Sequence, residues 1–194
     1  IFTGFKNKTY IVEVWKNKKD VLSLVLFSIF GMFAVQYPFF LTIAESNAAT
    51  ATILQYLGPI FIVLYYSIIN KKLPSKINVL ALVFAGVGTF LLVTHGNTNT
   101  LSISPKALFW GLVSAMALAS YSILPINLLK KYYASAIVGW GLFLGGLFSS
   151  ALNPPWIIQG TWDIQTVLLV GFVILCGTLI AFSSYLMAVK IIGA

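Results

Sequence analysis

Long uncharged intervals limit what this chain can fold into more than any other feature. Only 8% of the 194 residues are charged, against roughly 25% in an ordinary soluble domain. Each of six intervals can hold the ~20 apolar residues with which a helix crosses about 30 Å of hydrocarbon. They are Val21 to Ala44, Ser46 to Asn70, Ile77 to Pro105, Ala107 to Leu129, Tyr132 to Trp162 and Ile164 to Val189. We therefore expect an all-α membrane protein with six spanning helices.

The basic residues predict how these helices cross the membrane. All twelve are lysines, and on a six-helix zigzag only Lys106 falls on the opposite side from the other eleven. Cytoplasmic loops of membrane proteins as a rule carry an excess of positive charge. This rule places the lysine-rich segments in the cytoplasm, namely residues 1–20, 70–76 and 129–133 and the C-terminal end. A nucleic-acid site would instead gather its lysines on one folded face. The placement of the lysines that give the net charge of +8 therefore indicates a multi-pass protein of the cytoplasmic (inner or plasma) membrane, with no nucleic-acid partner.

Small residues at helical spacing predict close helix contacts. These residues are Ala81, Ala85, Gly86 and Gly88 in the third interval, Gly111, Ala115 and Ala119 in the fourth, and Gly141 and Gly145 in the fifth. Outside the membrane we expect His95 and a loop carrying Trp156 and Trp162 at the interface. Cys176, in the middle of the last interval, is expected to serve packing.

The stretch QYPFFLTIAESNAATATILQYLGPIF, residues 36 to 61, has polar residues at spacings that could face a cavity, and a proline in each arm. It reads as one helix end, a turn at residues 45–47 and the start of the next helix. A proline within a helix removes a backbone hydrogen bond and kinks or breaks the helix. We expect hinges at Pro38, Gly58, Pro59 and Pro125.

Thr52, Gln55, Tyr56 and Pro59 recur at i, i+3, i+4 and i+7, which puts them on one helix face. Two interpretations are open. The face lines a substrate cavity, or Thr52 and Gln55 bridge neighbouring helices with hydrogen bonds of ~0.6 kcal/mol each. Aromatic residues on the first and last helices have the same ambiguity between packing and cavity lining. The full set of candidate substrate-binding residues is Gln36, Tyr37, Phe40, Thr52, Gln55, Tyr56, Ser114, Tyr121, Thr178, Phe182 and Tyr185.

A weak internal repeat relates the two ends of the chain. A shift of 145 residues lays FFLTIAESNAA (39 to 49) over SYLMAVKIIGA (184 to 194) and pairs Tyr37 with Phe182 and Phe40 with Tyr185. The lysine topology makes the two copies run in opposite directions through the membrane. Inverted repeats of this kind build many secondary transporters, which bind their substrate at mid-membrane between the halves.

The pattern YPFFLTIAESNAATATILQYLGPIF, with its SNAA turn and central proline, resembles the EamA-type drug/metabolite transporters. The resemblance implies a ten-helix bundle of two inverted five-helix repeats that moves a small metabolite, amino acid or drug-like solute, often outward. The six helices would then be the third to eighth of a longer protein. Residues 1–104 would end the first repeat, and residues 105–194 would begin the second.

Catalytic chemistry has no support in the sequence. Glu45 is expected to be a solvated cap at the outer interface, and Glu13, Asp20 and Asp163 are expected in loops, so no carboxylate lies deep in the membrane. Metal-ligand spacing, a nucleophile–base pair and a phosphate-binding glycine loop are all missing, so we expect neither an enzyme nor a metal or cofactor. The alternative to a transporter is a non-transporting scaffold or assembly subunit. Expected partners are a small solute and lipid, with a homodimer left open.

Overall fold

The computed structural model describes residues 9–94, 103–152, 154 and 163–192, with only the backbone described at 9, 10, 92 and 93. Every regular element of these residues is a helix. Contacts divide the chain into two units, one of residues 34–123 and one of residues 1–33 with 124–194. They are called the middle unit and the end unit here, and each is described by itself.

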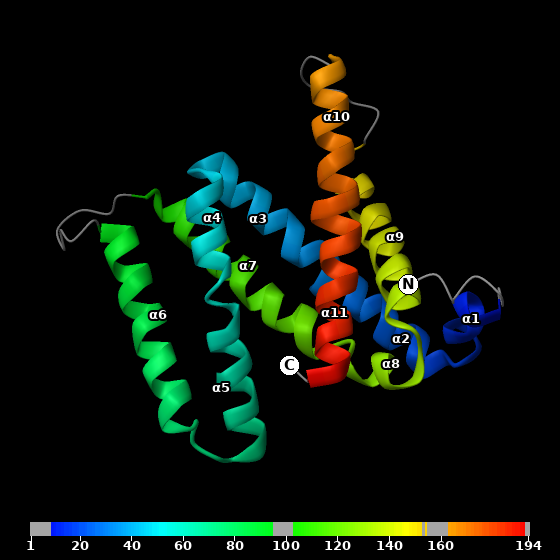
Figure 1. Cartoon of the computed structure of the whole chain (residues 1–194), viewed down its shortest axis with the longest axis horizontal. Coiled ribbons are helices and arrows are strands. Elements are labelled where there is room, and N and C mark those ends of the chain that lie inside the picture. The colour runs from blue at the N-terminus through cyan, green and yellow to red at the C-terminus, as the bar shows by residue number, and fades with distance from the viewer. Residues whose placement is uncertain (1–8, 95–102, 153, 155–162, 193–194) are drawn as a thin grey trace. The chain divides into compact units, whose positions relative to one another are not determined.

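The middle unit is built on a long helix, α7 (Pro105–Ile123), against which three other helices pack. These are α3 (Ala34–Glu45), α4 (Ala48–Gln55) and α5 (Gly58–Asn70), and α6 (Lys76–Thr94) completes the unit. Figure 1 shows α5 following α4 in nearly the same direction and α6 returning. Leu54, Leu57 and Ala115 form a buried apolar cluster. Gly111 lies so close to the Leu54 side chain that a Cβ there would collide with it, so the small-residue contact predicted for this helix is confirmed.

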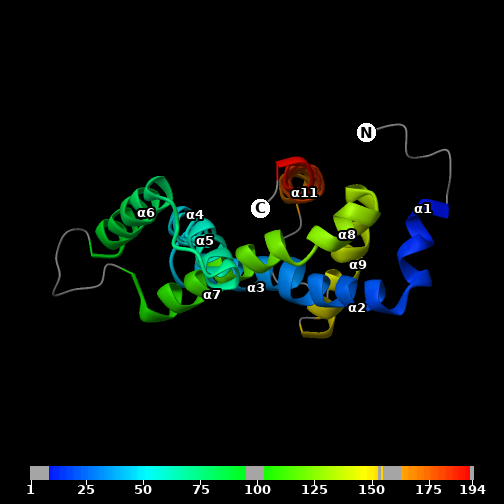
Figure 2. The same cartoon turned by 90° about the horizontal axis from the view of Figure 1, so that it is seen from below.

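The end unit begins with α1 (Thr9–Val12), the 3₁₀ turn η2 (Glu13–Lys16), α2 (Lys18–Leu26) and the π-helical η3 (Phe27–Phe33). It resumes with α8 (Ile126–Lys131) and α9 (Ala134–Leu152), and ends with α10 (Ile164–Phe172), the π-helical η4 (Val173–Ile180) and α11 (Ala181–Ile192). In Figure 1 the last three form one continuous helix, and Figure 2 shows α2, α8 and α9 close together.

Two glycines bring α9 against η3 in the end unit. A Cβ on Gly141 would lie 2.8 Å from the Phe27 ring, and one on Gly145 would lie 3.3 Å from the Ser28 carbonyl oxygen. Phe27 and Met32 are fully buried at this contact. The GxxxG prediction is therefore confirmed, because only a residue without a side chain lets the two backbones approach so closely.

The predicted set of spans is largely recovered. Among the described residues, five helices are long and apolar enough to cross a membrane, namely Lys18–Glu45, Ala48–Asn70, Pro105–Lys131, Ala134–Leu152 and Ile164–Ile192. The third predicted span corresponds to α6, whose apolar part Lys76–Leu91 is shorter. Gly86 and Gly88 of α6 have no heavy atom within 4 Å of a built Cβ in the described part of the chain, so the predicted contact is absent at these two glycines. Ala85 of the same predicted set does pack against the Leu54, Leu57 and Ala115 cluster.

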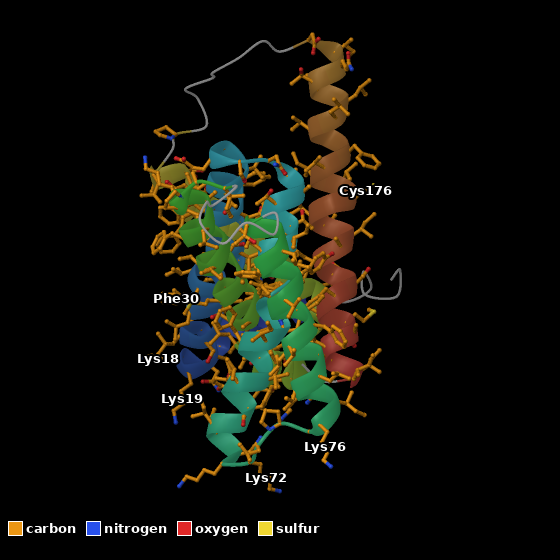
Figure 3. The ribbon with its side chains drawn as sticks, turned by 90° about the vertical axis from the view of Figure 1, so that its left-hand side faces the viewer. Lys18, Lys19, Phe30, Lys72, Lys76 and Cys176 are labelled. Atoms are coloured by element: carbon orange, nitrogen blue, oxygen red, sulfur yellow. The ribbon has the colours of Figure 1, made fainter. Side chains whose placement is uncertain are left out.

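Two further expectations concern single residues. Cys176 is exposed, about halfway along the α10–η4–α11 helix, rather than packed as predicted (Figure 3). His95, Trp156 and Trp162, expected at the outer interface, lie outside the described residues.

Candidate functional site

The turn that opens α4 follows from one side chain. Asn47 precedes the helix with extended backbone, and its Oδ1 accepts a hydrogen bond from the Thr50 N–H at 2.8 Å. This bond satisfies one of the N–H groups that a helix start leaves without a partner. Glu45 is the exposed last residue of α3. It therefore lies at the helix end, as expected, but the cap of the next helix is Asn47.

Gln55 connects three helices of the middle unit. Its Nε2 donates to the Ser114 Oγ of α7 at 2.7 Å and to the Val35 carbonyl of α3 at 3.3 Å. The Ser114 hydroxyl also lies 3.5 Å from the same carbonyl, and Ser114 is fully buried. A carbonyl oxygen has two lone pairs and can accept bonds beyond that of its own helix. The structure thus brings together two predicted site residues, Gln55 and Ser114, as a polar bridge in an apolar bundle.

The helix is interrupted directly after Gln55. α4 ends at Gln55 and α5 begins at Gly58, with Pro59 in its first turn. Proline is tolerated at that position, because the first N–H groups of a helix have no partner in it anyway. A Cβ on Gly58 would lie 2.8 Å from the Leu118 side chain of α7, so this glycine also permits close packing. The polar bridge therefore sits beside a break in the backbone.

The other predicted hinges differ from one another. Pro125 separates α7 from α8, as the sequence predicts. Pro38 lies inside α3, which continues through it, and its carbonyl accepts a hydrogen bond from the buried Thr42 hydroxyl at 2.8 Å. Such a bond gives a polar group in a membrane helix a partner in its own backbone. Movement at any of these positions stays a prediction.

The remaining candidates of the middle unit differ in how exposed they are. Tyr121 is 1% exposed, whereas Tyr56 is 69% exposed and Phe40 57% exposed. The Thr52 hydroxyl bonds to the Ala48 carbonyl of its own helix. Gln36 and Tyr37 are half-buried on α3. On the predicted face from Thr52 to Pro59, Gln55 bonds to other helices and Tyr56 is mostly exposed. Whether this face lines a cavity stays a prediction.

The candidates on the last helix belong to the end unit. Thr178 lies in η4, where its hydroxyl bonds to the Val173 carbonyl at 3.2 Å, and Phe182 and Tyr185 lie in α11. Thr178 and Phe182 are half-buried, and Tyr185 is 38% exposed. A cavity lined by both sets of candidates stays a prediction.

Sequence reasoning missed a charged cluster in the end unit, which we call the Asp20 cluster. Asp20 is in the first turn of α2, not in a loop, and it is 7% exposed. Its carboxylate accepts hydrogen bonds from the Lys131 Nζ at 2.8 and 3.1 Å and from the Tyr132 hydroxyl at 2.8 Å. The expectation that Asp20 lies in a loop is therefore wrong. The sequence did contain a signal that Asp20 belongs to a helix, because the positive end of the helix dipole stabilises an acid in the first turn.

The Tyr132 side chain keeps its proton in this cluster. Partial burial raises the pKa of the Tyr132 hydroxyl, and its hydrogen bond to the Asp20 carboxylate raises it further. Both effects act against the phenolate, since burial disfavours a charge and Asp20 is a like charge. Tyr132 is thus a donor at neutral pH. In the described part of the chain, no three His, Cys, Asp or Glu side chains are grouped as metal ligands.

Comparison with known proteins agrees with the transporter-like layout. Residues 2–94 match the EamA-like transporter family. Over 193 residues, or 98% of its own length, the chain is 42% identical to a Salmonella typhimurium protein named as an uncharacterized inner membrane transporter, YicL. The chain spans 63% of that relative's length. No solved structure matches the chain. The family resemblance predicted from the sequence is confirmed.

Proposed function

Because residues 2–94 of this chain belong to the EamA-like transporter family, we propose that the protein is a secondary transporter. It moves a small metabolite, amino acid or drug-like solute across the cytoplasmic membrane, outward and by alternating access. The relative's name, an inner membrane transporter, supports this location. The relative extends beyond the matched chain, so the proposal concerns the full-length protein, as a ten-helix bundle of two inverted repeats divided between residues 104 and 105.

The observation that carries the proposal is the Gln55–Ser114–Val35 bridge beside the helix break at Gly58 and Pro59. Discontinuous membrane helices with free backbone groups at mid-depth are a common element of transporter sites. A bundle that only packed would need neither the break nor a half-buried amide bonded to two other helices. In alternating access, the solute takes over polar contacts that the bridge makes when the site is empty.

Two π-helical segments support the inverted repeat. η3 covers Phe27–Phe33, and a shift of 145 residues carries it to 172–178, nearly onto η4 at Val173–Ile180. π-helical turns are rare and frequent at functional sites. Their recurrence at equivalent positions agrees with the shift that pairs Tyr37 with Phe182.

Solute efflux tests the proposal. Cells expressing the full-length protein are loaded with a panel of amino acids and small metabolites, and release is followed by mass spectrometry. We expect one class of solute to leave faster than from cells without the protein. Gln55→Ala should slow this release by more than about threefold. A loss of stability alone would explain at most about threefold, because an interhelical hydrogen bond contributes ~0.6 kcal/mol.

The matched control is Gln165→Ala, because Gln165 is exposed at the start of α10. This variant should leave release unchanged. Equal membrane levels of all variants are checked by immunoblot. If no solute leaves faster than from control cells, the scaffold alternative replaces the transporter. If Gln55→Ala and Gln165→Ala behave alike, Gln55 is not part of the site. The same purified protein gives its oligomeric state by mass, which tests the expected homodimer.

A further inference from the structure

A pocket of about 380 Å³ opens in the end unit. Its lining comes from four short pieces of chain that meet at helix ends: η2, the last turn of α8, the α8–α9 connection and the last turn of α11. The lining residues are Glu13, Lys131, Tyr132, Tyr133 and Lys190. Nothing in the proposed transport mechanism uses this pocket.

The two lysines of the pocket differ in how their charge is balanced. Lys131 is paired with Asp20 at 2.8 Å. Lys190 donates to the Tyr132 carbonyl at 3.1 Å and lies 6.0 Å from the centre of the Tyr133 ring. It forms no ion pair with a carboxylate in the described part of the chain. An ammonium group has three donors, so Lys190 retains donors for a ligand that carries negative charge.

Glu13 adds the opposite charge to the same pocket. It is exposed, and it too forms no ion pair among the described residues. A ligand with only a phosphate would meet Lys190 and be repelled by Glu13. A ligand that carries both a phosphate and an ammonium group satisfies both side chains, and charge-assisted hydrogen bonds of this kind are among the stronger ones in proteins.

Aromatic residues place the pocket at the membrane surface. Trp15 and Trp140 contact each other edge to face, with ring centroids 5.0 Å apart, and the Trp140 Nε1 donates to the Ile11 carbonyl at 2.6 Å. These contacts hold α1 and η2 against α9. Tryptophan and tyrosine are enriched at the level of lipid headgroups. The pocket also lies where membrane spans begin or end, at Lys18, Lys131, Ala134 and Ile192.

We propose that this pocket binds the headgroup of a phospholipid that carries a phosphate and a primary ammonium, as phosphatidylethanolamine does. The phosphodiester lies at Lys190, and the ammonium donates to Glu13. The lysine distribution makes this the cytoplasmic leaflet. The lipid source is favoured over a soluble zwitterion because the pocket opens at headgroup depth, among interfacial aromatic residues.

Lipid binding to the purified full-length protein tests the proposal. Phosphatidylethanolamine, phosphatidylcholine and phosphatidylglycerol with identical acyl chains are added in detergent, and bound lipid is counted by native mass spectrometry. Phosphatidylethanolamine should bind best, because a trimethylammonium group cannot donate to Glu13 and phosphatidylglycerol has no ammonium. Lys190→Gln should weaken its binding about tenfold, as expected for one lost charge-assisted bond.

Two more variants make the test specific. Glu13→Gln should remove the preference over phosphatidylcholine while phosphatidylglycerol binds no worse. Lys106→Gln, at an exposed lysine at the start of α7, should bind like the unchanged protein. Equal binding of the three lipids, or an equal loss in Lys106→Gln, overturns the proposal. So does soluble phosphoethanolamine that competes at the concentration of the lipid, since the site would then be one for a free zwitterion. Thermal unfolding without lipid verifies that each variant folds.

Discussion

At the scale of single residues, the structure separates polar side chains that look alike in the sequence. Gln55 and Tyr56 are neighbours, but Gln55 bonds to α3 and α7, and Tyr56 is 69% exposed. Asp20 and Asp163 both stand at a helix start, yet Asp20 is 7% exposed and Asp163 is exposed. The difference arises because burial depends on which helix packs over a position, and helix spacing alone does not specify the neighbour.

The first prediction concerns Asp20. Hydrogen bonds to a charged group contribute ~1.5–3 kcal/mol, but the Lys131 side chain is 53% exposed, and solvent screens its share. We expect Asp20→Asn to lower the free energy of unfolding by about 1–2 kcal/mol. Unfolding by heat in detergent measures it. The control is Asp163→Asn, which should have little effect at neutral pH because asparagine caps a helix about as well as aspartate. Equal loss in both variants would contradict the role of the cluster.

A second prediction concerns acid. The Thr166 side chain and its backbone N–H, which donates to Asp163 Oδ1 at 2.8 Å, lower the pKa of Asp163 below its ordinary value. A carboxyl group with a lowered folded pKa stabilises above its unfolded pKa, and this contribution is lost as the pH falls through the folded value. Comparing unfolding temperatures from pH 5 down to pH 2, we expect the unchanged protein, which is about as stable as Asp163→Asn at pH 5, to become the less stable of the two, because asparagine does not titrate. A constant difference would show that the charge of Asp163 does not contribute.

At the scale of helices, glycine permits close contact only where a neighbouring element packs against it. Gly111, Gly141 and Gly145 each lie where a Cβ would press on a neighbouring element, whereas Gly86 meets nothing within 4 Å. The sequence shows the same small-residue pattern in each of these helices. Their difference follows from packing, because a small residue permits a close approach but does not by itself create one.

Substitution by alanine tests this contrast. In Gly111→Ala the new methyl group must displace the Leu54 side chain, and overpacking of this kind costs about 1–3 kcal/mol. In Gly86→Ala the methyl has open space, and the better helix propensity of alanine should leave stability unchanged or raise it by up to about 1 kcal/mol. Unfolding temperature in detergent distinguishes them. A destabilised Gly86→Ala would mean that α6 is closely packed at that position.

At the scale of the whole molecule, charge orients the helices. Lys72 and Lys76 lie at the α5–α6 connection, and Lys18 and Lys19 lie at the start of α2 (Figure 3). Lys106 lies at the start of α7, so one helix, α6, separates it along the chain from Lys72 and Lys76. The rule that cytoplasmic loops are rich in lysine then predicts one orientation for all spans.

Cysteine labelling measures this orientation directly. The single native cysteine is first removed as Cys176→Ser, and Lys72→Cys and Lys106→Cys are made in that background. A maleimide that cannot cross the membrane should label Lys106→Cys in intact spheroplasts and Lys72→Cys only in inverted vesicles. The reverse pattern would contradict the lysine-based topology, and it would also move the lipid pocket to the outer leaflet.

The helices, their approximate ends and the breaks at Pro59 and Pro125 follow from the sequence by itself, whereas α3 continues through Pro38. Low charge over about 20 residues forces a helix in hydrocarbon, because no water is there to satisfy backbone groups. Asn47, Pro59 and Pro125 begin or interrupt helices through local hydrogen bonding, so the turn at residues 45–47 and both breaks were predictable. The family resemblance depended on the same local pattern.

Only the tertiary structure decided which polar groups meet. The Gln55 bridge joins residues 20 and 59 positions apart, and the Asp20 cluster joins residues 111 and 112 positions apart. Periodicity places a residue on a face of its own helix, but the helix opposite that face is chosen by the packing of the whole bundle. For that reason the sequence determined the spans of this protein, and the fold alone determined its polar bridge, its buried acid and its charged pocket.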